Sequence, residues 1–175
     1  MQKRNALFLA PLVIVGVALL IVWGGAASAA GRSAGGEVHL YEADTSLAGN
    51  LGTVILTGAI TDYGTDHQGI PQDGTNRLEL SKGSFSIYVN DLGNKLASMP
   101  FDPTTCSSAG SATAPVPIVA GSGTGAYEGI HGTFETKGTT AAILPRLPNG
   151  ECNTSATQYS GILFAHGSGR VAYKG

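Results

Sequence analysis

The sequence predicts an all-β domain, and three observations support that fold class. Short stretches of alternating apolar and polar residues recur along the chain, most clearly at 84–90, where Phe85, Ile87 and Val89 alternate with polar neighbours. Gly, Asn, Asp and Pro separate these stretches, as is typical of turns between strands. After the N-terminal leader, no window carries a helical apolar repeat of 11 or more residues.

Eight or nine strands are expected, separated by short connections. They cover residues 38–41, 53–61, 77–81, 84–90, 106–114, 116–120, 132–143, 157–165 and 168–173. A sheet of this size must protect its edge strands, and closure into a barrel does so most completely. We therefore expect an antiparallel barrel, with a two-sheet sandwich as the alternative.

The first 30 residues differ from the rest of the chain and predict an export segment. Lys3 and Arg4 precede an apolar run of 18 residues at 6–23, and small residues follow it. Ala27-Ser28-Ala29 has the A-x-A form of a cleavage site, so we expect 1–29 to be a signal peptide. The run is also close to the shortest length that spans a bilayer, which makes a retained membrane anchor the alternative. Either way, the remainder is expected to be secreted or held in the cell envelope.

The rest of the chain is expected to form one domain. Residues 30–36 are a flexible Gly/Ser linker, and 37–175 are long enough for a single core. The full chain has 10 basic and 12 acidic residues and a net charge of −2. This balance lacks the basic surface that a nucleic-acid partner requires. Low charge with abundant Gly, Ser and Thr also argues against a coiled coil.

Cys106 and Cys152 are the two cysteines of the chain and predict a disulfide bond. They have no C-x-x-C or C-x-x-H spacing, so neither a zinc site nor a redox pair is indicated. An oxidising exterior favours the bond, and closing a loop of this size stabilises a fold by about 4 kcal/mol in the chain-entropy model. Two buried free thiols are the alternative. The 4 histidines are scattered without chelating spacing, so no metal is expected.

The Gly-rich stretch at 121–126 matches a variant of the dinucleotide-binding fingerprint. Gly129 and Gly132 follow at once and argue against the helix that such a site requires, so nucleotide binding is not indicated. We expect a tight connection between two strands instead, with glycines where φ is positive.

Ionisable residues concentrate on the early strands, at Glu42, Asp44, Asp62, Arg77 and Glu79. In an eight-stranded barrel, alternate residues face a lumen that is either packed or just wide enough for one small ligand. A carboxylate facing an apolar lumen is desolvated, which raises its pKa and suits acid–base or electrostatic work. The alternative is that these charges all lie on the outer, solvated face.

Two stretches of the chain resemble plant allene oxide cyclases. EVHLYE at 37–42 and LGTV at 51–54 resemble the first two strands of that family, and GSGTGAYEGIHG at 121–132 resembles its Gly-rich turn. Dirigent proteins carry a similar turn, and the sequence also resembles bacterial exported proteins of the allene-oxide-cyclase barrel-like type. The resemblance implies an antiparallel eight-stranded barrel of calycin type, often oligomeric, with an apolar cavity and no cofactor.

The resemblance also implies roles for individual residues. The cyclases fold an unsaturated fatty-acid epoxide in the cavity for ring closure, using a first-strand carboxylate and a water held by Asn. The carboxylate position matches Glu42, whereas Asp44 stands where the family has Asn, and the proline expected between 45 and 51 is missing. Dirigent proteins hold two phenoxy radicals for coupling, a role suited to residue types such as Asp62, Tyr63 and Arg77.

We therefore expect an exported barrel that binds an apolar small molecule in its lumen, with or without isomerase activity. The candidate catalytic residues are Glu42 and Asp44, and the candidate ligand-binding residues are Asp62, Tyr63, Arg77 and Tyr88. A non-catalytic surface or envelope protein is the first alternative, and dirigent-like control of radical coupling is the second.

Overall fold

The computed structural model of the protein describes residues 35–45, 51–68, 73–156 and 160–173. The predicted signal peptide or anchor at 1–29 lies outside these residues, as does most of the predicted linker. Within the described part of the chain, no helix has the length and apolar character needed to cross a membrane.

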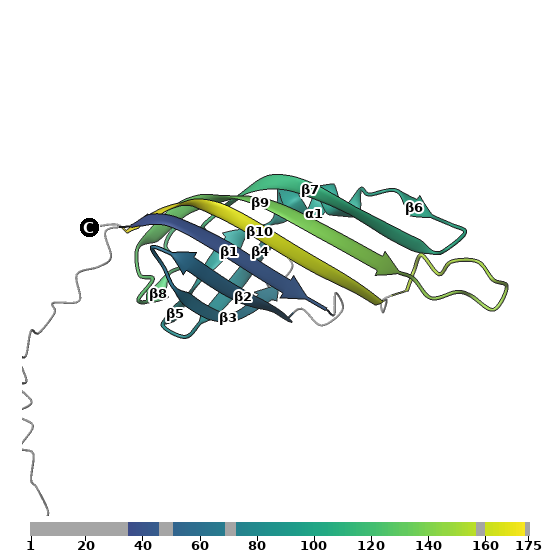
Figure 1. The fold of residues 1–175 in the computed structure, drawn as a ribbon. Helices are drawn as coiled ribbons and strands as arrows, with labels where there is room; N and C mark the ends of the chain where they lie inside the picture. Colours follow the sequence, from purple (N-terminus) through teal and green to yellow (C-terminus); the bar gives the residue numbers. More distant parts are fainter. Residues whose placement is uncertain (1–34, 46–50, 69–72, 157–159, 174–175) are drawn as a thin grey trace, which may run out of the picture.

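One antiparallel sheet of ten strands contains every strand of the described residues (Figure 1). Across the sheet the order is β6-β7-β9-β10-β1-β2-β3-β4-β5-β8. Along the chain the elements are β1 (Gly36–Asp44), β2 (Leu51–Gly58), β3 (Asp62–Gln68), β4 (Thr75–Leu80), β5 (Gly83–Tyr88), α1 (Asn90–Ala97), β6 (Phe101–Asp102), β7 (Ser107–Pro117), β8 (Thr124–Gly125), β9 (Ile130–Ile143) and β10 (Ser160–Tyr173).

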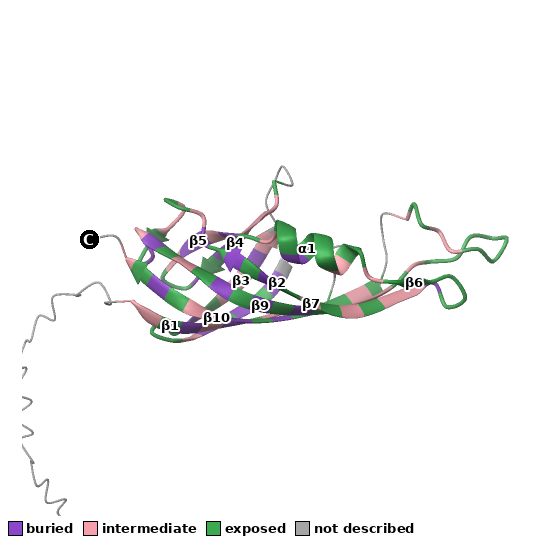
Figure 2. Ribbon diagram, turned by 90° about the horizontal axis from the view of Figure 1, so that it is seen from above, coloured by how far each residue is buried: buried purple, intermediate pink, exposed green. Residues whose placement is uncertain are grey.

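The all-β antiparallel class is confirmed, but the closed eight-stranded barrel is not found. The ladder of strands is open, because it begins at β6 and ends at β8. Strand β5 meets the segment after β7 through a bridge between Ile87 and Ile118 and a 2.8 Å hydrogen bond from the Val119 N–H to the Ser86 carbonyl. Helix α1 follows β5 and packs on β7 and β9, so a helix covers the side that further strand pairing would close (Figure 2).

The strands expected from sequence correspond to strands of the sheet, with several differences. Strand β3 was not expected, because its sequence is polar and lacks apolar alternation, and the two-residue strands β6 and β8 were not expected either. Residues of the expected stretches 106–114 and 116–120 lie in the single strand β7, which ends at Pro117, and residues of 157–165 and 168–173 lie in the single strand β10. Residues 157–159 are outside the described part of the chain. Strand β10 continues through Gly167 and Gly169 because both stay in register with β1.

Helix α1 is an addition to the expected all-strand fold. It has 8 residues, fewer than the 11-residue window in which a helical repeat was sought. Leu92 and Leu96 lie four residues apart and form its apolar side. An ion pair of 2.9 Å between Asp91 and Lys95 stabilises the same turn. Gly138 of β9 makes room for the helix, because a Cβ there would lie 2.9 Å from Leu96 Cδ1.

The core lies on the inward face of the curved sheet. Alternate residues of each strand point inward, as Val38 and Leu40 of β1 and Val54 and Leu56 of β2 do. Figure 2 shows that the buried residues gather over this part of the sheet, whereas the end that carries β6 is exposed or half-buried apart from Cys106. The sheet therefore has a packed end and a projecting end.

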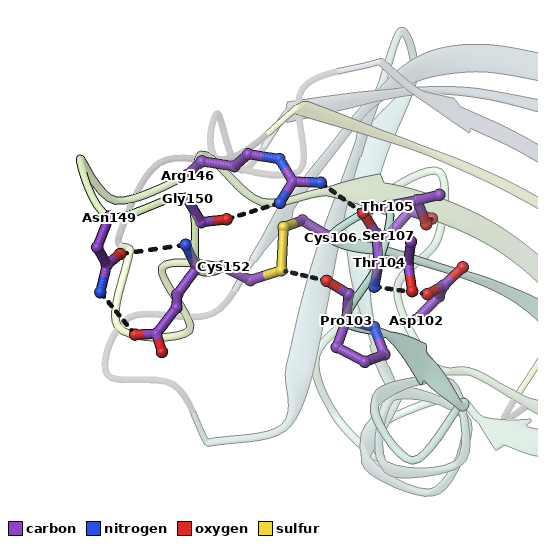
Figure 3. The surroundings of a disulfide bond; sticks show 11 residues. Asp102, Pro103, Thr104, Thr105, Cys106, Ser107, Arg146, Asn149, Gly150 and Cys152 are labelled. Carbon is purple, nitrogen blue, oxygen red and sulfur yellow. Dashed lines mark hydrogen bonds between the residues drawn. A yellow bond between two sulfur atoms is a disulfide. The ribbon is translucent and has the colours of Figure 1, made fainter.

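The predicted disulfide between Cys106 and Cys152 is formed at the projecting end (Figure 3). The two Cα atoms lie 5.4 Å apart across 46 positions of sequence. The bond ties the start of β7 to the loop between β9 and β10. Arg146 supports this loop by donating hydrogen bonds to the carbonyls of Gly150, at 2.7 Å, and Thr104, at 2.5 Å. A disulfide of this kind is consistent with a location outside the cell.

The Gly-rich stretch at 121–126 connects β7 to β9, as the sequence predicted. Gly121 and Gly125 have φ values of +76° and +60°, which explains the need for glycine at both positions. A Cβ at Gly123 would lie 1.9 Å from the Tyr127 carbonyl oxygen. The stretch contains the short strand β8 and leads into β9 without an intervening helix.

Candidate functional site

A cavity of about 570 Å³ lies between the inward face of the sheet and helix α1. Its volume falls in the range of about 300 to 1,000 Å³ that is common for small-molecule sites. Most of the wall is apolar, with aliphatic side chains from both the sheet and the helix: Leu40, Ile87, Val89, Leu92, Leu96, Val116 and Leu163. The cavity is therefore a hydrophobic chamber closed on one side by α1.

Carboxyl groups gather on one part of this wall. Glu42 and Asp44 share the inward face of β1 with Leu40, because alternate residues of a strand point to the same side. Asp66 of β3 and Asn76 of β4 reach the cavity from the neighbouring strands. The sheet thus brings three acids and one amide together in an otherwise apolar chamber.

Gly52 of β2 allows Glu42 to approach Asp66 across the strand between them. Gly52 pairs with Asp66 in the ladder of β2 and β3. A Cβ at Gly52 would lie 3.2 Å from Glu42 Oε1 and 3.4 Å from Glu42 Cγ. A larger residue at this position would push the Glu42 side chain away from Asp66.

Asp66 is buried, with 4% of its surface exposed. Asn76 donates a hydrogen bond of 2.5 Å from Nδ2 to Asp66 Oδ2. Oδ1 of Asp66 is buried as well, and it accepts no hydrogen bond from the described residues. No N–H group or hydroxyl group of the described residues reaches Oδ1, so the donor available to Asp66 beside Asn76 is the carboxyl group of Glu42 when it is protonated.

Glu42 and Asp66 are neighbouring carboxyl groups that affect each other's pKa. Burial, the charge of Asp66, the hydrogen bond to Asp66 and the charge of Asp44 together raise the pKa of Glu42 to about 9. Burial also raises the pKa of Asp66, against the lowering effects of its hydrogen bonds with Glu42 and Asn76. Two ionised carboxylates cannot hydrogen-bond to each other. At neutral pH Glu42 is therefore the protonated partner of the pair.

Of the six predicted catalytic and binding residues, the structure places Glu42 and Asp44 at the cavity. Tyr63 is 70% exposed, and Tyr88 is exposed as well. Arg77 lies at the surface, where its Nε is 3.4 Å from Glu79 Oε1. These three residues are not part of the cavity wall.

Asp62 is buried away from the cavity and holds chain segments together. Its carboxylate accepts hydrogen bonds from the Tyr127 hydroxyl, the Ser81 hydroxyl and the backbone N–H groups of Tyr63 and Lys82. Burial alone would raise the pKa of Asp62, but these four hydrogen bonds outweigh it and lower the pKa to about 2. Asp62 therefore has a structural role, since its carboxylate connects these segments of the chain.

The sequence analysis missed Asp66 and Asn76 as cavity residues. Asp66 lies four positions after Asp62 in one strand, a spacing that puts both on the same face. Asn76 lies two positions before Leu78 and extends the inward series of Leu78 and Leu80. Both signals were present, but β3 was not recognised as a strand.

Within the described residues, no group of three or more His, Cys, Asp or Glu side chains has the arrangement of a metal site.

A second depression, of about 480 Å³, involves the outer face of β1, β2, β9 and β10. Tyr41 stacks on His166 there, with ring centroids 4.9 Å apart.

Comparison with known proteins does not identify a relative: no family model, no curated protein and no solved structure matches the chain. The function is therefore argued from the geometry and chemistry of the cavity.

Proposed function

We propose that the protein binds an apolar small molecule in the cavity between the sheet and helix α1. The observation that carries this proposal is the make-up of the cavity, about 570 Å³ with an aliphatic wall and its polar groups gathered at one place. Small-molecule sites combine apolar walls with a few placed polar groups in this way. The export segment predicted from sequence and the disulfide at the projecting end fit a protein that acts outside the cell.

A purely structural surface or envelope protein is the alternative. A packed scaffold gains stability from filling its interior, and an empty chamber costs it contacts. Burying two acids beside that chamber adds a further cost, since buried ionisable groups are unfavourable unless they are paired. The cavity and its acids therefore favour a binding function over a scaffold.

The binding function is tested with a neutral, apolar fluorescent probe and two matched variants. Ala142 of β9 lines the cavity, and the adjacent Ala141 points to the opposite face of the strand. We expect Ala142→Phe to weaken probe binding at least about tenfold by filling the chamber, and Ala141→Phe to leave it unchanged. A bound ligand should also raise the melting temperature of the native protein. Equal binding by both variants would contradict the proposal.

An isomerase that needs no cofactor is the second candidate, and the Glu42–Asp66 pair supports it. A carboxylic acid that stays protonated at neutral pH in an apolar site can donate a proton to the oxygen of a bound epoxide or carbonyl group. Glu42 lines the cavity, and proton donation is the role that the resemblance to allene oxide cyclases implies for it. Asp44 contributes a nearby negative charge in place of the family's Asn. Dirigent-like coupling is not proposed, since Asp62, Tyr63 and Arg77 do not meet at the cavity.

The isomerase candidate is tested with an unsaturated fatty-acid epoxide, offered as its methyl ester so that no substrate anion faces the carboxyl groups. We expect cyclised product above the uncatalysed yield, lost in Glu42→Gln and retained in the surface variant Glu135→Gln. Asp44→Asn, which restores the family's residue type, should retain or raise the rate. Turnover that is the same in Glu42→Gln and in the native protein would exclude this chemistry.

A further inference from the structure

The outer face of the sheet carries large apolar side chains in contact with solvent. Tyr41 of β1, Ile55 of β2 and Phe164 of β10 keep 45%, 48% and 49% of their surface exposed. Tyr41 lies between Leu40 and Glu42, which line the inner cavity, so it points to the opposite side of the sheet. Apolar clusters exposed on a folded protein mark surfaces that bind a partner or a ligand.

The strand register places these side chains in two adjacent rows. In the first row Ile55 lies opposite Tyr41, and Tyr41 lies opposite His166. In the second row Ala43 lies opposite Phe164. The outer depression of about 480 Å³ is lined from both rows. Ala43 carries only a methyl group among larger neighbours, so the depression is deepest over this residue.

The spacing of the rings suits a flat ligand. Tyr41 and His166 stack on each other and form one wall. His166 and Phe164 lie two positions apart in β10, and a strand rises about 3.3 Å per residue, so their side chains leave the sheet about 7 Å apart. A planar ring in van der Waals contact on both sides requires twice about 3.5 Å. One aromatic ring therefore fits between them, whereas a puckered saturated ring is thicker and fits less well.

Lys137 of β9 supplies a positive charge at the edge of the depression. It pairs with His166 in the ladder of β9 and β10, so it extends the first row. Lys137 is exposed, and no acid of the described residues forms an ion pair with it. It is the one Lys or Arg among the described lining residues. Glu42 also borders the depression, but its side chain belongs to the inward face, and Glu135 lies outside the depression.

We infer that this outer depression binds a planar aromatic anion, with its rings between His166 and Phe164 over Ala43 and its carboxylate at Lys137. Stacked aromatic rings stabilise each other beyond the area that they bury. The cation at Lys137 favours an anion over a neutral molecule of the same shape. A lipid surface would require several cations, and the described lining residues provide one. The site lies on the other side of the sheet from the inner cavity and does not depend on ligand binding there.

Three ligands test the inference: 2-naphthoate, 2-naphthalenemethanol, which lacks the charge, and decalin-2-carboxylate, which lacks the planar rings. Each is titrated at pH 7 into the native protein, and binding is followed by NMR through the ring signals of His166, which report on the outer face. We expect 2-naphthoate to bind about threefold or more tighter than the alcohol. It should also bind about fivefold or more tighter than the decalin compound.

Two variants separate the ring contact from the charge. Phe164→Leu keeps an apolar side chain and removes the ring, so the preference for 2-naphthoate over decalin-2-carboxylate should fall to about twofold or less. Tyr63→Leu is the matched control, because Tyr63 is an exposed ring of the same face that does not line the depression. Lys137→Gln should remove the preference for 2-naphthoate over the alcohol and keep the preference for planar rings.

A third pair of variants locates the site. Ala43→Phe fills the depression and should weaken 2-naphthoate binding at least about tenfold. Ala109→Phe, at an exposed alanine of β7 that does not line the depression, should leave it unchanged. Ala142→Phe, which fills the inner cavity, should also leave 2-naphthoate binding unchanged while it weakens binding of the apolar probe. Loss of 2-naphthoate binding in Ala142→Phe would place the ligand in the inner cavity, and the inference would be wrong.

The remaining outcomes decide against the inference without affecting the inner cavity. Equal binding of 2-naphthoate and decalin-2-carboxylate to the native protein would mean that the face is an unselective apolar surface. Equal preference for the anion in Lys137→Gln and in the native protein would remove the role of Lys137. Changes in the His166 signals when the ligand-free protein is diluted would show that a second copy covers this face. Absence of binding by all three ligands would exclude the site altogether.

Discussion

The hydroxyl group of Tyr127 donates a hydrogen bond of 2.5 Å to Oδ2 of Asp62, across 65 positions of sequence. Tyr127 follows the Gly-rich turn, and Asp62 begins β3, so the bond connects, inside the core, two segments that are far apart in sequence. Ser81 donates to the same carboxylate from the turn between β4 and β5. Burial and the hydrogen bond to Asp62 raise the pKa of the Tyr127 hydroxyl, which keeps it a donor.

The first prediction concerns Asp62→Asn and acid stability. Because the folded pKa of Asp62 is about 2 and its ordinary value is 3.8, ionised Asp62 stabilises the fold above about pH 4, and this contribution is lost as the pH falls towards 2. We expect the variant to lose about 2 kcal/mol of unfolding free energy at pH 7 and about half of that at pH 3. Urea unfolding at both pH values measures the difference. An equal loss at pH 3 and pH 7 would show that the charge of Asp62 is not responsible.

The second prediction concerns Tyr127→Phe. The ring of Tyr127 packs edge-on against Phe85 with centroids 5.4 Å apart, and Phe keeps that contact while removing the donor. We expect a loss of about 1 to 2 kcal/mol in unfolding free energy. Combined with Asp62→Asn, the loss should be smaller than the sum of the two, because both variants break the same bond. Tyr88→Phe, at an exposed tyrosine, should change stability by less than about 0.5 kcal/mol. Additive losses would argue against the bond.

The third prediction concerns Glu42→Gln and alkaline stability. Glu42 has a folded pKa of about 9 and an ordinary value of 4.5, so the unfolded chain ionises first and native stability falls as the pH rises between these values. Gln cannot ionise and can donate to Asp66 from its amide. We therefore expect the variant to be more stable than the native protein at pH 8. The difference in unfolding free energy, variant minus native, should be at least about 1 kcal/mol larger at pH 8 than at pH 5. Glu135→Gln should show no such trend. A native protein whose stability is flat from pH 5 to pH 8 would contradict the prediction.

How far the cavity could be predicted from sequence depends on the strand that each residue occupies. Leu40 alternates with polar neighbours in β1, and Glu42 and Asp44 lie two and four positions after it on the same face, but the pattern alone left open whether these charges face the core or the solvent. Strand β3 has no such alternation, and its place in the sheet depends on pairing with β2 and β4. Asp66 therefore acquires its position from neighbouring strands rather than from its own sequence.

The open sheet could not be predicted for a related reason. Whether β5 pairs with β7 depends on contacts between distant parts of the chain, which alternation within one strand does not describe. Helix α1, which packs on β7 and β9, was not predicted either, and its apolar side consists of little more than Leu92 and Leu96. An amphipathic segment this short carries too weak a periodic signal to stand out.

The fourth prediction concerns the disulfide. Replacing both Cys106 and Cys152 by Ser removes a constraint on a loop with a sequence separation of 46. We expect a loss of about 3 to 4 kcal/mol in unfolding free energy, because the unfolded chain gains freedom. Chemical denaturation of the native, reduced and double-Ser proteins measures this loss. The reduced protein and the double-Ser variant should have the same free energy of unfolding. Unchanged stability after reduction would mean that the bond does not constrain the unfolded chain.

The last prediction concerns the packing of α1 on Gly138. A Cβ at this position would lie 2.9 Å from Leu96 Cδ1 and 3.5 Å from Leu92 Cδ1, so any side chain here presses on the helix that closes the cavity. We expect Gly138→Val to cost about 1 to 3 kcal/mol in unfolding free energy and to weaken binding of the apolar probe, because α1 must move from the wall. Thr139→Val on the outer face of β9 is the control and should do neither. Loss of stability with full probe affinity would show that the cavity does not depend on the position of α1, and the helix would then be a cover for the core alone.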